Sequence, residues 1–60
     1  MNQKKPLVLI VDDEEQVLAL LSAALRRKGI ETLTSKNGED ALSIIRKENS
    51  IKLVLLDICL

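Results

Sequence analysis

The sequence has no histidine, and Cys59 is its only cysteine. Structural and catalytic zinc sites are built mainly from these two residue types, so the composition argues against a zinc site. One cysteine cannot form a disulfide within the chain, which fits a reducing cytosol. The longest apolar runs are also short, because Asp12 interrupts the first of them. We therefore predict no signal peptide, no transmembrane segment and a cytoplasmic location.

An excess of charge of either sign is absent as well. The nine basic and nine acidic residues cancel, giving a formal net charge of +0. No overall field attracts nucleic acid or an anionic membrane, so we expect this segment to bind neither directly. The hydrophobic share of 47% and the charged share of 30% are those of a soluble globular protein.

Two apolar runs stand out, and each ends in acid. Residues 7–11 (LVLIV) are followed by Asp12 and Asp13, and residues 53–56 (LVLL) are followed by Asp57. Runs that are apolar at every position are typical of strands covered on both faces of a sheet. Burying an unpaired carboxylate is costly. We therefore expect the two runs to be neighbouring strands whose ends form one acidic, cation-binding cluster.

The segment between the two runs predicts a helix, a strand and a second helix. The first helix covers residues 14–28, with Asp13 as its N-cap and Gly29 at its end. Its expected buried stripe consists of Val17, Leu18, Leu21, Ala24 and Leu25. Residues 30–34 mix polar and apolar side chains, as an edge strand does.

The second helix follows Asn37, its expected N-cap, and should turn Ala41, Leu42 and Ile45 inward. Residues 52–56 complete a β-α-β-α-β order, in which the helical crossovers imply parallel strands. If the sheet order is 2-1-3, the two apolar strands are adjacent, and their carboxyl ends meet where ligands bind in open α/β sheets. Clustered carboxylate oxygens at that edge favour a hard ion such as Mg²⁺.

Three stretches together resemble the receiver domain of two-component response regulators. They are residues 9–14 (LIVDDE), 37–42 (NGEDAL) and 53–60 (LVLLDICL). The resemblance implies an α/β, flavodoxin-like parallel sheet in the order 2-1-3. It covers all of residues 1–60 but only the first half of the family's domain. We therefore expect a partial receiver domain, truncated before strands 4 and 5 and continuing beyond residue 60 in a parent protein.

The resemblance also implies roles for individual residues. Asp57 matches the phosphoacceptor, which takes a phosphoryl group from a sensor histidine kinase, a phosphotransfer protein or a small acyl phosphate. Asp12 and Asp13 match the acidic pair that binds Mg²⁺, and the backbone carbonyl of Cys59 matches a main-chain ligand. These roles describe a phosphoacceptor switch and not an enzyme. In the segment alone, we expect weak magnesium affinity and impaired or absent phosphorylation. The open edge of the third strand is a template for another chain, so we also expect self-association or partial disorder.

Simpler interpretations remain open. In these interpretations Asp57 caps a turn and Asp13 caps a helix, neither as part of a metal site, and Cys59 is a small buried apolar residue. One alternative function is a non-catalytic half-domain that associates with itself. Another is a haloacid-dehalogenase-like phosphotransferase, whose motif is Asp-x-Asp, whereas here Glu14 stands two residues after Asp12.

Overall fold

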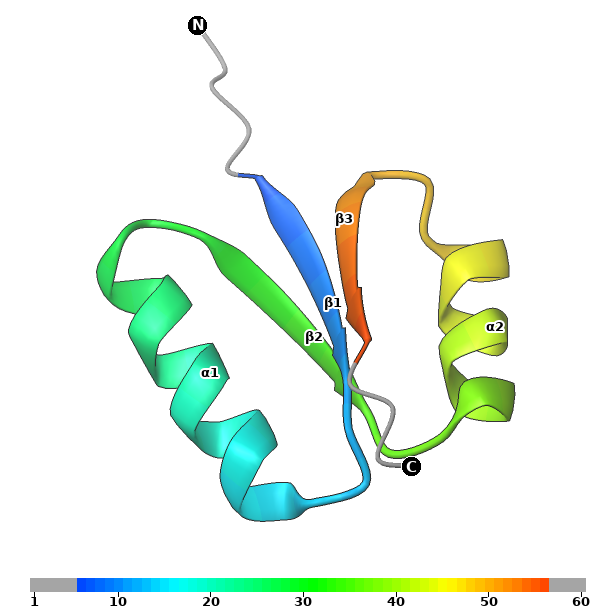
Figure 1. The fold of residues 1–60 in the computed structure, drawn as a ribbon. Helices are drawn as coiled ribbons and strands as arrows, with labels where there is room; N and C mark the ends of the chain where they lie inside the picture. The colour runs from blue at the N-terminus through cyan, green and yellow to red at the C-terminus, as the bar shows by residue number, and fades with distance from the viewer. Residues whose placement is uncertain (1–5, 57–60) are drawn as a thin grey trace, which may run out of the picture.

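The computed structural model describes residues 6–56, which form a three-stranded sheet and two helices (Figure 1). The elements are β1 (Leu7–Val11), α1 (Glu15–Arg27), β2 (Glu31–Ser35), α2 (Gly38–Lys47) and β3 (Ile51–Leu56). The predicted β-α-β-α-β order is confirmed, and each predicted bound lies within one residue of the observed one. Among these residues, no helix has the length and apolar character needed to cross a bilayer.

The sheet is parallel, and its strand order is β2-β1-β3, which confirms the predicted 2-1-3 arrangement. β1 is the central strand, and it holds the two most deeply buried large side chains, Leu9 and Ile10. Its continuous run of apolar residues is explained by this position, because side chains on both faces of a central strand are covered. Figure 1 shows α1 on one side of the sheet and α2 on the other.

Each helix packs on its own apolar layer. The layer beneath α1 contains Val8, Ile10 and Leu18, with Leu21, Leu25, Ile30 and Leu55 packed around them. The layer beneath α2 contains Leu9, Val11 and Ala41, with Leu33, Ile44 and Ile51 packed around them. Alternate residues of β1 therefore serve opposite layers, as the two-residue period of a strand requires.

The end of α1 is set by Gly29, as predicted. Gly29 has φ +81°, a left-handed conformation that costs glycine little. Its N–H donates to the Arg26 carbonyl, and the Ile30 N–H donates to the Leu25 carbonyl, each at 3.0 Å. These two bonds form a Schellman motif, which satisfies carbonyls at the helix end. The predicted N-cap of α2 is also confirmed, since the Asn37 side chain accepts a hydrogen bond of 2.8 Å from the Asp40 N–H.

The predicted N-cap of α1 was wrong. The N-cap residue is Glu14, whose side chain makes no capping hydrogen bond, and Asp13 is exposed. The polar contact at this end comes instead from Asp12, whose Oδ1 accepts from the Glu14 N–H at 2.9 Å. Any of the four consecutive acidic residues 12–15 could stand at the N-cap position. The residue that does so depends on where β1 ends and the chain turns into α1.

The predicted inward face of α2 was only partly right. Ala41 is buried, but Leu42 is 54% exposed and Ile45 is 41% exposed. Ile44, which the prediction missed, packs on the apolar layer beneath α2 instead. The helix turns Ala41 and Ile44 toward the sheet, which leaves Leu42 and Ile45 on its flank. On α1, Ala24 of the predicted stripe is likewise exposed.

Candidate functional site

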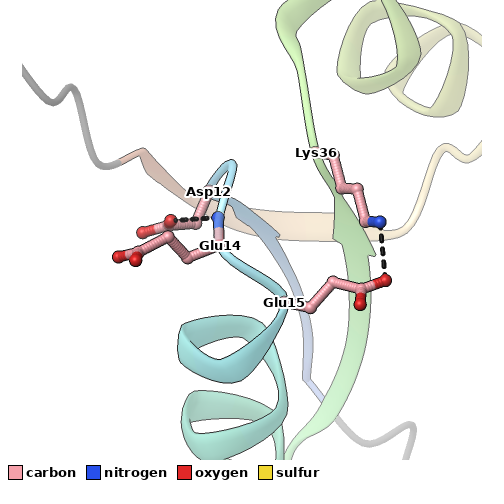
Figure 2. Close-up of polar contacts among 4 residues, drawn as sticks. All are labelled: Asp12, Glu14, Glu15 and Lys36. Carbon is pink, nitrogen blue, oxygen red and sulfur yellow. Dashed lines mark hydrogen bonds and ion pairs between the residues drawn. The ribbon is translucent and has the colours of Figure 1, made fainter.

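The candidate site lies at the carboxyl end of β1, where Asp12 is held by two hydrogen bonds. Its backbone N–H donates to the Ser35 carbonyl at 3.0 Å, which ties it to the end of β2. Its side-chain Oδ1 accepts from the Glu14 N–H at 2.9 Å (Figure 2). This bond to the backbone two residues further along is the usual turn geometry of aspartate. Asp12 is only 3% exposed, so both its position and its orientation are fixed.

The second oxygen of the same carboxylate is unsatisfied. Asp12 Oδ2 is buried and has no hydrogen-bond partner within residues 6–56. A buried charged group without a partner destabilises the folded state. A divalent cation would remove that penalty, and a carboxylate oxygen is the donor type that Mg²⁺ prefers. The environment of Asp12 therefore fits a metal ligand.

The acidic residues that follow Asp12 are exposed, unlike Asp12 itself. Asp13, Glu14 and Glu15 are all exposed. Figure 2 shows the carboxylates of Asp12 and Glu14 extending to the same side, away from Glu15. Across residues 6–56, no three acidic, histidine or cysteine side chains gather closely enough to hold a metal ion. Asp57 and Cys59 fall outside the described residues, so the predicted convergence of Asp12, Asp13 and Asp57 stays a prediction.

The strands that lead to the two acidic ends are neighbours. Val11, the residue before Asp12, is the register partner of Leu56, the residue before Asp57 in the sequence. β1 and β3 are parallel, so the carboxyl ends of both runs lie at the same end of the sheet. This confirms the first step of the expected cluster, which is that the two acid-terminated runs lie side by side.

An ion pair near this edge was not anticipated from the sequence. Lys36 Nζ lies 2.6 Å from Glu15 Oε2, joining the loop after β2 to the first turn of α1 (Figure 2). The hydrogen bond and the positive charge of Lys36 lower the pKa of Glu15 below its ordinary value. Both side chains are exposed and distant in sequence, so no local pattern signals their contact.

Ser35 is a second residue that the sequence analysis missed. It is 5% exposed, and its hydroxyl donates to the Asn37 carbonyl at 2.8 Å. This bond shapes the turn from β2 into α2, while the Ser35 carbonyl holds the backbone of Asp12. The signal that could have revealed it is a serine two residues before Asn37, a spacing at which serine hydroxyls close local turns.

Comparisons with known proteins point to one family. The family model described as "Response regulator receiver domain" matches residues 8–60. The chain is 40% identical over 58 residues, or 97% of its length, to the autoinducer 1 sensor kinase/phosphatase LuxN of Vibrio harveyi. It is 40% identical over all 60 residues to the alkaline phosphatase synthesis transcriptional regulatory protein PhoP of Bacillus subtilis. Over 57 residues, or 95% of its length, it is 42% identical to sporulation initiation phosphotransferase F of the same organism.

The chain spans only part of each of these relatives. It covers 7% of the LuxN protein, 23% of PhoP and 43% of sporulation initiation phosphotransferase F. No solved structure gives a significant match to the chain.

Proposed function

Because the chain belongs to the response regulator receiver domain family, we propose that it is the phosphoacceptor part of a two-component phosphorelay in the cytoplasm. Asp57 is the acceptor in this proposal, and Asp12, Asp13 and the backbone carbonyl of Cys59 are the further magnesium ligands. The phosphoryl donor is a sensor histidine kinase or a phosphotransfer protein. The names of two relatives, a sensor kinase/phosphatase and a phosphotransferase, support a donor of this class.

The observation that carries the proposal is the buried Oδ2 of Asp12, which has no hydrogen-bond partner in the part of the chain that the structure describes. A side chain kept only to close the turn before α1 would need one oxygen, and Asp12 already uses Oδ1 in that way. Among residues 6–56 the second oxygen has no hydrogen-bond partner, as expected of a metal ligand. The pairing of Val11 with Leu56 supports the same proposal, because the sequence continues from these residues into Asp12 and Asp57.

The chemistry that follows is a direct phosphoryl transfer. A carboxylate oxygen of Asp57 attacks phosphorus and forms an O–P bond, while the bond from phosphorus to the donor atom breaks. The electron pair of that bond leaves with the donor. Magnesium supplies neutralisation of the phosphoryl oxygens when bound. Asp12 and Asp13 would hold the magnesium ion beside Asp57, and the turn at Asp12, which is fixed by bonds to Ser35 and Glu14, would limit reorganisation of the site during the transfer.

The product is a modified switch and not a released substrate. Phosphorylation adds negative charge at one edge of the sheet and thereby biases a surface between two states. The family match decides against the haloacid-dehalogenase-like alternative, and the spacing of Asp12 and Glu14 agrees, since that family's motif is Asp-x-Asp.

The proposal is tested by phosphorylating the 60-residue chain with acetyl phosphate and reading its intact mass. We expect a single phosphoryl adduct, at low stoichiometry, that requires magnesium and is released by hydroxylamine as an acyl phosphate. Asp57→Asn should abolish the adduct, and Asp12→Asn should reduce it strongly.

Asp40→Asn is the matched control, because Asp40 is an exposed acid in the first turn of α2. It should leave the adduct unchanged. An adduct that persists in Asp57→Asn, or that forms equally well when EDTA replaces magnesium, would refute the assignment of the acceptor. Failure to form any adduct, even at high acetyl phosphate, would refute the proposal for this chain.

A further inference from the structure

Ser35 is the last residue of β2, and its polar side chain lies on an apolar face of the sheet. Its register partner on β1 is Val11, which belongs to the apolar layer beneath α2. Register partners on neighbouring strands point to the same face, so the Ser35 hydroxyl lies on that face too. The residue is only 5% exposed. Packing against this layer requires only an apolar side chain, so packing alone does not explain the hydroxyl.

The hydroxyl of Ser35 is bonded to the start of α2. It donates to the Asn37 carbonyl at 2.8 Å and accepts from the Asn37 N–H at 3.4 Å. The same carbonyl accepts from the Ala41 N–H at 3.1 Å, which is the bond that an N-cap residue makes to the first turn of its helix. The hydroxyl therefore ties the end of β2 to the first turn of α2.

The backbone carbonyl of the same serine holds Asp12. It accepts from the Asp12 N–H at 3.0 Å, one residue beyond the last register pair of β1 and β2. Asp12 Oδ1 in turn accepts from the Glu14 N–H at 2.9 Å. Asp12 Oδ2 has no hydrogen-bond partner among residues 6–56, so the bonds to the rest of the residue set its direction. These bonds lead from α2 through Ser35 to the Asp12 carboxylate.

We propose that Ser35 is a positioning residue, whose hydroxyl fixes the end of β2 and thereby directs Asp12 Oδ2 toward the magnesium ion. This inference rests on the proposed function, because it takes Asp12 as a magnesium ligand. Ser35 acts through Asp12 and does not contact the ion. Residues that orient a metal ligand raise metal affinity in this way. Without the hydroxyl, the Ser35 carbonyl and the Asp12 turn gain freedom, and magnesium binding then costs the entropy of ordering them.

The first test is amide hydrogen exchange of the 60-residue chain without magnesium, measured by nuclear magnetic resonance. Ser35→Ala should speed exchange of the Asp12 amide, relative to the amide of Leu9 in the central strand, by about threefold to tenfold, the effect of one hydrogen bond. A general loss of stability would speed both amides equally. Ser43→Ala is the matched control, because Ser43 is exposed on α2 and should leave both rates unchanged. Equal changes at the two amides in Ser35→Ala, or none, would overturn the inference.

The second test is a magnesium chloride titration followed by the chemical shift of the Asp12 amide. Ser35→Ala should raise the magnesium dissociation constant by about threefold to tenfold, because its effect on the ligand is indirect. Ser35→Thr keeps the hydroxyl and should restore the affinity, whereas Ser43→Ala should not change it. If the added methyl group prevents Ser35→Thr from folding, as judged by circular dichroism, the relative exchange rates in Ser35→Ala decide.

The titration also distinguishes failure of this inference from failure of the proposed function. If the unmodified chain does not bind magnesium, both are overturned. If the unmodified chain binds magnesium, Asp12→Asn does not, and Ser35→Ala binds as tightly as the unmodified chain, only the role of Ser35 is overturned. Weaker binding in Ser35→Ala that Ser35→Thr restores supports the positioning role.

Discussion

Replacing Asp12 with asparagine distinguishes two effects of its buried carboxylate: the loss of folding stability that the charge causes, and the binding of magnesium. Asparagine keeps an oxygen for the 2.9 Å bond from the Glu14 N–H but removes the charge shared with the unpartnered Oδ2. An unsatisfied buried polar group costs about 1–3 kcal/mol, and more when it is charged. The asparagine amide would replace an oxygen that has no partner within residues 6–56, so we expect only part of that cost to be recovered. Without magnesium, we therefore expect Asp12→Asn to raise the free energy of unfolding by about 1 kcal/mol.

With magnesium present, we expect the unmodified chain to become more stable than Asp12→Asn. A ligand at ten times its dissociation constant stabilises the folded state by about 1.4 kcal/mol, and each further tenfold adds about as much again. The unmodified chain should gain this stability, and Asp12→Asn should gain almost none. The two unfolding curves should therefore cross during a magnesium titration.

Urea unfolding followed by far-ultraviolet circular dichroism measures both effects, since the chain has no tryptophan, tyrosine or phenylalanine to report by fluorescence. Glu31→Gln is the control, because it removes one charge from an exposed position at the opposite end of the sheet. Sodium chloride at the ionic strength of the magnesium chloride titration separates magnesium binding from screening. A variant that is less stable than the unmodified chain without magnesium, or that gains as much from magnesium, would refute the reasoning about Oδ2.

Three further predictions concern the scaffold around this site. Leu9 is fully buried in the central strand, so Leu9→Ala should lower the free energy of unfolding by about 2–5 kcal/mol in a urea titration. The control is Leu20→Ala, at an exposed position, which should change the free energy of unfolding by less than about 0.5 kcal/mol. Asn37→Ala should cost about 1 kcal/mol through loss of the α2 cap, whereas Asn37→Asp should retain most of that stability. The pKa of Glu15 is lowered by Lys36, so their ion pair contributes above the unfolded-state pKa and is lost as the pH falls through the folded-state pKa. Lys36→Met should return the pKa of Glu15 to its ordinary value in a carbon-13 titration of its carboxyl group, and an unchanged pKa would show that Lys36 is not the cause.

Local signals predicted most of the scaffold. The run at residues 7–11 predicted a strand covered on both faces, and β1 is that strand. The same expectation was wrong for residues 53–56, where Leu53 and Leu56 are exposed because β3 lies at the edge of the described sheet. Gly29 and Asn37 each set one helix end through a mechanism that the residue type itself supplies. The strand order was predicted by another route. It came from the family resemblance, because the sequence pattern predicts the strands but not which of them are neighbours in the sheet.

The errors arose where a residue's role depends on a distant surface. At the start of α1, Asp13 and Glu14 are both chemically able to cap, and the backbone bond from Asp12 to Ser35 decides how the chain enters the helix. On α2, the four apolar residues Ala41, Leu42, Ile44 and Ile45 form a stripe that is too wide for all of them to face the sheet. The residues that face the sheet depend on how far the helix overlaps β3, which left Leu42 exposed.

The two acids at the ends of the apolar runs depend on different parts of the fold. Asp12 is fixed by bonds to Ser35 and Glu14, which need only β1, β2 and the start of α1. The strand that precedes Asp57 is β3, whose last residue, Leu56, is 59% exposed. Any partner that binds folded β3 therefore stabilises the strand leading to the acceptor while leaving the Asp12 turn unchanged.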